Sequence, residues 1–239
     1  MLDGVAITLD VDWAPDFMID DAARVLVERG VRATWFVTHR SPAVERLAET
    51  PLFELGLHPN FLAGSTHGDS WEAVLAHCAE LVPDAVSMRT HALVQSTPLL
   101  DFVASETGVR IDVSLYLPHA PGLQPVEHAS ARGSLVRVPY VWEDDLEMTR
   151  ASPVWSIGAM SRAAGLKVLD FHPVHVYLNS ARLAGYEELK RQGSFSDLDA
   201  GAAQPYVNRT EPGTRDMFVE AADHLAAHGG GRTISEVVS

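Results

Sequence analysis

The chain has 239 residues, of which 46% are hydrophobic and 21% are charged. A chain of this composition can bury one sizeable core, which excludes an intrinsically disordered protein and favours one domain over residues 1–239. Eighteen basic residues against thirty-two acidic residues give a formal charge of −14, which argues against nucleic acid or an anionic membrane as the main partner.

Apolar runs of strand length alternate with stretches of helical spacing along most of the chain. We expect strands at residues 5–11, 34–38, 53–58, 86–91, 110–115, 135–142 and 166–171. We expect helices at residues 19–29, 69–82, 97–106 and 217–227. Residues 117–132 and 193–213 fit neither pattern, and long irregular segments of this kind are often lids or binding loops.

This alternation of strands and helices is typical of an α/β fold. Strands that are apolar along their whole length belong to parallel sheets that are covered on both faces. A count of roughly seven to eight such strands in a chain of this length favours a barrel over an open sheet.

The sequence also bears on the compartment. No apolar run approaches the roughly twenty residues that cross a bilayer. The N-terminal sequence Met-Leu-Asp-Gly lacks the basic and apolar regions of a signal peptide, and the single cysteine, Cys78, cannot form an intrachain disulfide. We therefore expect a cytoplasmic protein without membrane insertion.

Two aspartates, Asp10 and Asp12, end the first expected strand. Because side chains alternate along a strand, both carboxylates point to the same face and converge. Such a pair suggests a metal ligand beside a general base, although loop capping or a salt pair also places acids at strand ends.

Similar polar pairs end two later strands, namely Arg89 with His91 and Asp170 with His172. A proline follows both His58 and His172, and it biases the residue before it toward extended geometry. In a parallel barrel the strand ends open onto one mouth. We therefore expect a common site formed by Asp10, Asp12, His58, Arg89, His91 and His172.

The other histidines carry weaker signals. A lone histidine is more often a core or surface residue than a ligand, and this applies to His39, His77, His119, His128, His224 and His228. The last two have the i, i+4 spacing of a metal pair, but a late helix followed by three glycines more simply carries them as polar-face residues. His175 lies three residues after His172, where it could orient a ligand, face the substrate or be structural.

On these residues the chain is similar to the polysaccharide deacetylases, the NodB-homology group of carbohydrate esterases, and within it to the WbmS-like branch. "ITLDVDWAPD" resembles the first motif of the family, "ELGLHPNF" the second, "MRTH" the third and "VLDFHPVH" the last. The resemblance implies a distorted, incomplete (β/α) barrel. It also implies residue roles: Asp10 as general base, Asp12 and His58 as metal ligands, Arg89 as the tether of Asp10, and His172 as general acid.

Two motifs depart from the family pattern. The second metal histidine of the family usually lies four residues after the first, where this chain has Leu62. His67, which lies on the same loop, is the preferred substitute, and His91 is the competing one. The fourth motif, an aspartate that positions the general acid, has no clean counterpart; its candidates are Asp170, Glu143, Asp144 and Asp145.

The activity that the resemblance implies is metal-dependent removal of an acetyl group from an N-acetylated sugar or a related amide, with a place in surface-polysaccharide biosynthesis. Mixed nitrogen and oxygen ligands suit zinc, and also cobalt, nickel or iron. Asp10 would take the proton of the attacking water and His172 would protonate the departing amine. Candidates for contacting the substrate or orienting the ligands are Trp13, His175 and Asp170. The sugar could be a small molecule or lipid-linked, and the sequence leaves the oligomeric state and the choice between N- and O-acetyl bonds open.

Two other functions stay open. "LDVDW" also resembles the opening motif of haloacid-dehalogenase-type phosphatases, although Trp13 replaces the small hydroxyl residue expected there. In that interpretation Asp10 is the nucleophile, Asp12 the acid, and Asp144 with Asp145 the magnesium ligands. The other alternative is a non-catalytic carbohydrate-binding relative, supported by Leu62 in a usual ligand position.

Overall fold

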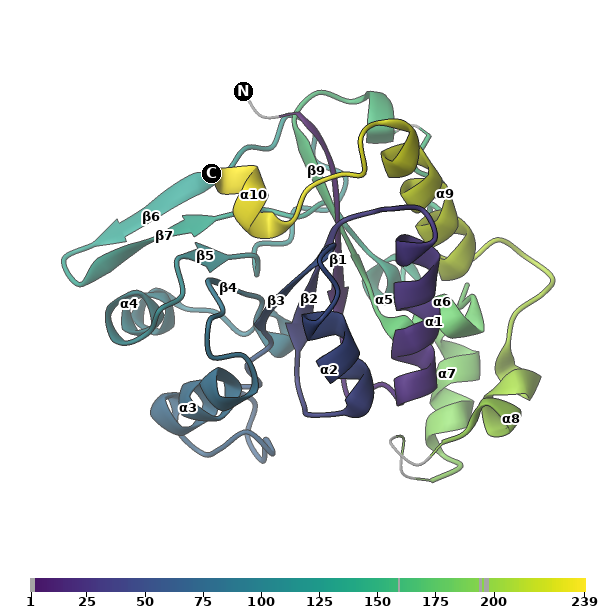
Figure 1. Cartoon of the computed structure of the whole chain (residues 1–239), viewed down its shortest axis with the longest axis horizontal. Coiled ribbons are helices and arrows are strands. Elements are labelled where there is room, and N and C mark those ends of the chain that lie inside the picture. The colour runs from purple at the N-terminus through teal and green to yellow at the C-terminus, as the bar shows by residue number, and fades with distance from the viewer. Residues whose placement is uncertain (1–2, 159, 194, 196–197) are drawn as a thin grey trace.

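A computed structural model describes residues 3–158, 160–193, 195 and 198–239. Within this part of the chain, nine strands form one sheet in the order β6-β7-β5-β4-β3-β2-β1-β9-β8 (Figure 1). The strands are β1 (Gly4–Asp10), β2 (Ala33–Val37), β3 (Phe53–Leu57), β4 (Ser87–Met88), β5 (Ile111–Asp112), β6 (Val126–Ser130), β7 (Gly133–Arg137), β8 (Trp142–Glu143) and β9 (Leu166–Phe171).

Helices alternate with the strands over most of the chain. They are α1 (Asp16–Val27), α2 (Pro42–Ala48), α3 (Trp71–Leu81), α4 (Thr97–Glu106), α5 (Asp144–Glu147), α6 (Pro173–Leu178), α7 (Leu183–Lys190), α8 (Ala200–Ala203), α9 (Thr214–Ala227) and α10 (Ile234–Val238), with 3-10 turns η1 (His91–Leu93), η2 (Met160–Arg162) and η4 (Gln204–Tyr206). Helices α1, α6 and α9 lie side by side (Figure 1) and pack against one another. Helix α1 buries residues at spacings of three and four, which is the amphipathic pattern of a helix on a sheet.

The strands around the centre of the sheet are parallel and level at their carboxyl ends. Asp10 pairs with Phe36 across β1 and β2, and Leu57 pairs with Met88 across β3 and β4. The antiparallel pair is β6 with β7. The residues that directly follow β1, β3, β4, β8 and β9 therefore meet at one edge of the sheet.

The sheet curls, and one segment bridges strands that lie on opposite sides of its centre. Between β7 and β8, the amide of Tyr140 donates to the carbonyl of Leu115 beyond β5, and the amide of Val141 donates to the carbonyl of Val168 in β9, each at 3.0 Å. Strand β8 then pairs with β9 at the far side of the sheet. This connection gives the distorted, incomplete barrel that the sequence predicted, and it confirms the α/β fold class.

Alternation along β1 divides its side chains between two environments. Ile7 and Leu9 pack in the core that includes residues of α1 and α9, whereas Ala6 packs with residues of β2, β5, β9 and α10 on the other face. Thr8 and Asp10 share that second face with Ala6 and are buried. The inner face of the curled sheet thus changes from apolar to polar toward the carboxyl ends of the strands.

Several expected elements have the predicted bounds or nearly so. Strand β9 and helix α4 coincide with the predictions at 166–171 and 97–106. The expected single strand at 135–142 is wrong, because the chain leaves β7 there and crosses to β8 on the other side of the sheet. The segment 117–132 is not wholly irregular, since it contains β6, which forms a hairpin with β7.

Two further predictions need adjustment. The expected strand at 86–91 shortens to β4, and the chain turns into η1 at His91. The segment 193–213 contains α8 and η4, while residues 194 and 196–197 lie outside the described residues. Among the described helices, none is both long enough and apolar enough to span a bilayer, and α9 has only 14 residues.

Candidate metal centre and its flanking acid and base

The polar residues that the sequence places at strand ends come together at the carboxyl edge of the sheet. Three potential ligand atoms there lie close to one another: Oδ1 of Asp12, Nε2 of His58 and Nδ1 of His91. The Asp12 oxygen is 3.1 Å from the His58 nitrogen and 3.0 Å from the His91 nitrogen, and the two nitrogens are 3.3 Å apart.

These separations fit a common cation. Nitrogen and oxygen ligands lie about 2.0–2.2 Å from zinc, so two ligands of one tetrahedral ion are separated by about 3.3 Å. A carboxylate oxygen and two imidazole nitrogens are also a donor set that zinc and related divalent metals accept. The arrangement therefore has both the spacing and the chemistry of a three-ligand metal site.

A strained turn aims Asp12 at this point. The amide of Ala14 donates to the carbonyl of Val11 at 2.9 Å, and the two central residues, Asp12 and Trp13, have φ values of 43° and 54°. Two positive φ values in a four-residue turn define the type I′ class, which favours glycine, asparagine and aspartate. A tryptophan there is unusual, and such strain clusters at functional sites.

The charges of the group are mutually stabilising. Burial acts to raise the pKa of Asp12, but hydrogen bonds from His58 and His91 hold it well below its ordinary value. Burial acts to lower the pKa of His91, but Asp12 raises it overall. Asp12 is therefore an anion with two imidazoles turned toward it.

Arg89 lies fully buried beneath this group. Its Nη1 atom donates to Oδ1 of Asp10 at 2.8 Å and also to Asp170, and its Nη2 atom donates to the hydroxyl of Thr8 at 2.8 Å. The guanidinium carbon lies 4.7 Å and 4.5 Å from the ring centroids of Phe36 and Tyr140. These contacts hold the guanidinium group in a single orientation. In that orientation it fixes the Asp10 carboxylate.

His172 is held by Asp144. Oδ1 of Asp144 lies 2.7 Å from Nδ1 of His172, and Oδ2 accepts the backbone N–H of His172 at 2.9 Å. The other ring nitrogen, Nε2, lies 3.6 Å from Oδ2 of Asp12. Burial acts to lower the pKa of His172, but Asp144 and its acidic neighbours raise it well above the ordinary value. His172 thus presents a protonated nitrogen to the site.

Two other groups of acids lie close enough to hold a cation: Asp10, Asp170 and His172, and Glu143, Asp145 and His172. Both groups depend on His172, whose Nδ1 atom already bonds to Asp144. Arg89 supplies the positive charge beside Asp10 and Asp170. Burial raises the pKa of Glu143 well above its ordinary value, which favours a neutral carboxyl group. The group of Asp12, His58 and His91 is therefore the better cation site.

Comparison with known families agrees with this geometry. A profile described as WbmS-like polysaccharide deacetylase matches residues 7–190. The chain belongs to this family. A crystal structure from Bordetella bronchiseptica, of a protein classed as a polysaccharide deacetylase involved in O-antigen biosynthesis, is 35% identical, covers 94% of this chain and 90% of that chain, and has a TM-score of 0.78.

More distant structures share the fold alone. The peptidoglycan deacetylase PdaC from Bacillus subtilis is 12% identical with a TM-score of 0.50, over 99% of this chain and 90% of that chain. The 4-alpha-glucanotransferase from Thermococcus litoralis is 12% identical with a TM-score of 0.51, over 98% of this chain and 38% of that chain. A comparison with curated proteins gives no match.

The structure separates the two candidates for the missing histidine of the deacetylase motif. His91 lies in the metal-binding group, whereas His67 turns its Nε2 atom to the carbonyl of Thr38 at 2.9 Å. Leu62, at the usual ligand position, is 45% exposed and has no side-chain atom that could bind a metal. The geometry therefore favours His91 over His67 as the third candidate ligand.

The remaining candidates lie around the candidate metal centre. Trp13 packs its ring against the rings of His67 and His91. Asp170 contacts Arg89 and Thr8, as described above. His175 is buried, lies 3.1 Å from the hydroxyl of Ser180 through Nδ1, and has its ring edge-on to His172.

Sequence reasoning missed several supporting residues. Thr8, Phe36 and Tyr140 hold Arg89, and Asp144 was only one of four candidates for the partner of His172. A signal for Asp144 was present, because it lies two residues after the expected strand at 135–142, near a strand end like the other site residues. Nothing local in the sequence links Phe36 or Tyr140 to Arg89.

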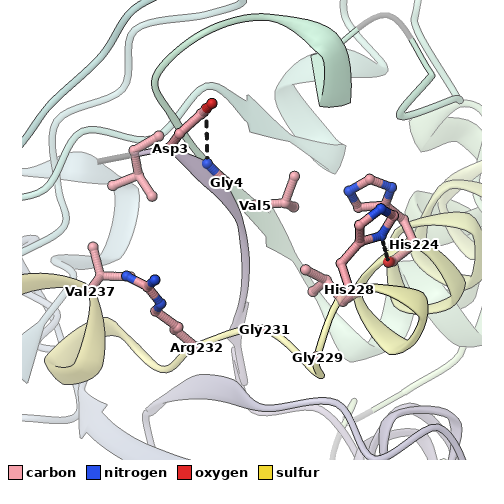
Figure 2. Close-up of a pocket in the computed structure, with 11 residues that line it drawn as sticks. Asp3, Gly4, Val5, His224, His228, Gly229, Gly231, Arg232 and Val237 are labelled. Carbon is pink, nitrogen blue, oxygen red and sulfur yellow. Dashed lines mark hydrogen bonds between the residues drawn. The ribbon is translucent and has the colours of Figure 1, made fainter. Parts of the chain in front are cut away.

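The histidine pair near the C-terminus lies apart from this site. His224 and His228 line a cavity of about 310 Å³ together with Asp3 and Arg232, at the amino end of β1 (Figure 2). Their rings stack with centroids 4.3 Å apart, and Nδ1 of His228 lies 2.6 Å from the carbonyl oxygen of His224. The length of β1 therefore separates this cavity from the candidate metal centre.

Proposed function

We propose that the chain is a metal-dependent hydrolase that removes the acetyl group of an N-acetylated sugar in surface-polysaccharide biosynthesis. The observation that carries the proposal is the cluster of Asp12, His58 and His91, with Asp10 fixed by Arg89 on one side and His172 on another. Membership of the polysaccharide deacetylase family supports it.

Asp12, His58 and His91 would hold the divalent metal, and zinc fits their donor atoms, as do cobalt, nickel and iron. A metal of this kind in a site with three protein ligands supplies Lewis-acid activation of water and of a carbonyl group. The chain's own contribution is to keep Asp12 ionised and to turn one nitrogen of each histidine to the same point.

Asp10 is the proposed general base. Its Oδ2 atom lies 3.6 Å from Nε2 of His58, so the carboxylate borders the metal group without being part of its tightest contacts. Arg89 occupies Oδ1 and leaves Oδ2 to accept the proton of the attacking water. The ion pair also keeps the carboxylate in one orientation.

His172 is the proposed general acid. An amine is a poor leaving group unless it is protonated as the carbon–nitrogen bond breaks. Nε2 of His172 faces the site while Asp144 stabilises the imidazolium form through Nδ1. Hydrolysis of an amide depends more on a general acid than hydrolysis of an ester does, because an amine leaves less readily than an alcohol. A histidine that is fixed in place as a proton donor therefore supports N-deacetylation over O-deacetylation.

Several broader features belong to the same proposal. The relative from Bordetella bronchiseptica is assigned to O-antigen biosynthesis, which supports an acetylated sugar precursor, free or lipid-linked, as substrate. The single sheet supports one catalytic domain over residues 1–239. The free, buried Cys78 is compatible with a cytoplasmic protein.

Acetate release from defined substrates tests the proposal. Zinc-loaded protein is incubated with N-acetylated amino sugars in free, nucleotide-linked and lipid-linked form, and with an O-acetylated sugar as comparison. We expect acetate from an N-acetylated sugar, at a rate that Asp10→Asn lowers by about 100-fold or more. Turnover that is equal in wild type and Asp10→Asn contradicts the proposed base.

Two alternatives give different outcomes. A non-catalytic relative would bind a sugar and release no acetate from any of these substrates. A phosphatase would form an aspartyl-phosphate at Asp10, but Asp144, one of its expected magnesium ligands, has both oxygens occupied by His172. The geometry therefore favours the hydrolase.

A further inference from the structure

His67 is a buried histidine close to the candidate metal centre whose role the proposed function does not explain. Its side chain is 4% exposed and lies nine positions after His58 on the loop that follows β3. Besides residues of α3, it contacts residues from three separate loops: Thr38 after β2, Asn60 after β3, and Trp13 after β1.

Both ring nitrogens of His67 have protein partners. A backbone carbonyl only accepts, so the contact of 2.9 Å between Nε2 and the Thr38 carbonyl places the proton on Nε2. A backbone amide only donates, so Nδ1 accepts the N–H of Asn60 at 3.2 Å. Burial lowers the pKa of His67, in agreement with this neutral tautomer. No lone pair of the ring is left to bind a cation.

Thr38 transmits this contact to the strained turn that carries Asp12. Its hydroxyl accepts the backbone N–H of Trp13 at 3.1 Å and lies 3.0 Å from Nδ1 of His39. Its carbonyl accepts from His67. Thr38 is therefore held from two sides, and it fixes the residue directly after Asp12.

The ring of Trp13 completes the link. Its centroid lies 5.5 Å from that of His67 and 5.3 Å from that of His91, so the indole lies against both imidazoles. Trp13 has a positive φ, which an L-residue avoids unless its surroundings impose it. Contacts of His67 with Thr38 and Trp13 supply that constraint.

We propose that His67 is a positioning residue, which ties the loops after β1, β2 and β3 together and so holds Asp12, His58 and His91 in their metal-binding arrangement. The inference rests on the proposed function, because it needs those three residues to bind a metal. It assigns to His67 a role through Thr38 and Trp13 instead of direct ligation.

Cobalt titration of the metal-free protein tests this role. Co(II) gives visible absorption bands that depend on its ligands, so position and intensity report the ligand set while the titration reports affinity. We expect His67→Ala to bind one equivalent of Co(II) with the wild-type spectrum and an affinity about 10- to 100-fold weaker. We expect His91→Ala to change the spectrum itself, because a ligand is lost.

Matched variants separate positioning from general damage. His67→Gln keeps a donor near the Nε2 position and is expected to restore most of the affinity. Thr38→Val removes the bond to the Trp13 amide and should weaken binding as His67→Ala does, whereas Thr38→Ser should not. His128→Ala is the control, because His128 pairs with Asp101 away from these loops.

The outcomes are distinguishable. If the spectrum of His67→Ala changes in the same way as that of His91→Ala, His67 is a ligand and the inference is overturned. Wild-type affinity for Co(II) in both His67→Ala and Thr38→Val overturns the inference as well. Should His67→Ala fail to fold by circular dichroism, the Thr38 pair decides the question. Failure of the wild-type protein to bind any Co(II) would instead refute the proposed function.

Discussion

Nδ1 of His91 lies 3.0 Å from Oδ1 of Asp12, although the two residues are 79 positions apart in the sequence. The parallel register brings them together, because β1 and β4 end at the same edge of the sheet and each is followed by residues with positive φ that turn the chain. Under the proposed function, His91 would take the third ligand position, where the family's usual histidine is replaced by Leu62.

His91→Ala is expected to lower the metal content of the purified protein. The variant keeps Asp12 and His58 but loses one of three ligands, which should weaken zinc binding by at least about 10-fold. Elemental analysis after dialysis against a weak chelator measures this. His128→Ala is the control, since His128 pairs with Asp101 away from the site. Equal zinc in His91→Ala and wild type would rule out His91 as a ligand.

Asp144→Asn is expected to weaken general acid catalysis. Loss of the anion beside Nδ1 lowers the pKa of His172, which Asp144 raises in the folded protein. Because the acid form is the active one, activity falls as pH rises through that pKa. The alkaline limb of the pH–rate profile should therefore move to lower pH, and kcat near neutrality should fall by about 100-fold.

A control and a contrary result define this test. Asp101→Asn removes the partner of a different histidine, His128, and should leave the profile unchanged. An alkaline limb at the same pH in Asp144→Asn and wild type would show that Asp144 does not set the protonation of His172.

Arg89→Met is expected to destabilise the fold as well as abolish activity. The change leaves Asp10 and Asp170 without their buried partner, and breaking a buried ion pair in this way costs about 3–5 kcal/mol. Urea denaturation measures the free energy of unfolding. Arg24→Met, which breaks an exposed pair with Asp21, should cost less than about 1 kcal/mol. Similar losses in the two variants would contradict the central role of Arg89.

Cys78 is expected to be unreactive in the native protein. It is fully buried among the side chains of α3 and its neighbours, and burial raises the pKa of its thiol to about 12. Because the thiolate is the reactive form, alkylation by iodoacetamide at pH 8 should be negligible in native buffer and complete in denaturant. Mass spectrometry of the intact protein reads out the difference, and rapid native alkylation would contradict the packing of α3.

Elements with strong local signals were predictable from the sequence, and those fixed by tertiary contacts were not. Strand β9 is mostly apolar and is buried along its whole length on both faces, so its bounds are evident. The two-residue strands β4 and β5 exist only through pairing with their neighbours. Strand β6 is largely exposed and lacks alternation, so its hairpin with β7 carries no hydrophobic signal.

The proline at the start of α6 has two structural meanings, of which the sequence analysis used only one. Pro173 directly follows His172, and this order predicted an extended histidine at a strand end, which the backbone angles of His172 bear out. Proline is also favoured in the first turn of a helix, where its missing N–H has no cost. Pro173 begins α6 for that reason, and it makes His172 the residue that joins β9 to α6.

Most of the candidate site could be anticipated because strand period and strand ends are local properties. The pairs at Asp10 and Asp12, and at Arg89 and His91, were recognisable on that ground. The choice between His67 and His91 was not, because it depends on where a loop folds back against Thr38. Distances across loops of this kind come only from the folded chain.

Reconstitution of activity with zinc tests the central claim most directly. Protein stripped with a chelator, and then freed of it, is titrated with Zn(II) while acetate release from an N-acetylated sugar is measured. We expect negligible activity in the stripped protein and a linear rise that ends at one equivalent of zinc, with no rise in Asp12→Asn. Full activity in the stripped protein, or a rise that Asp12→Asn shares, would contradict it.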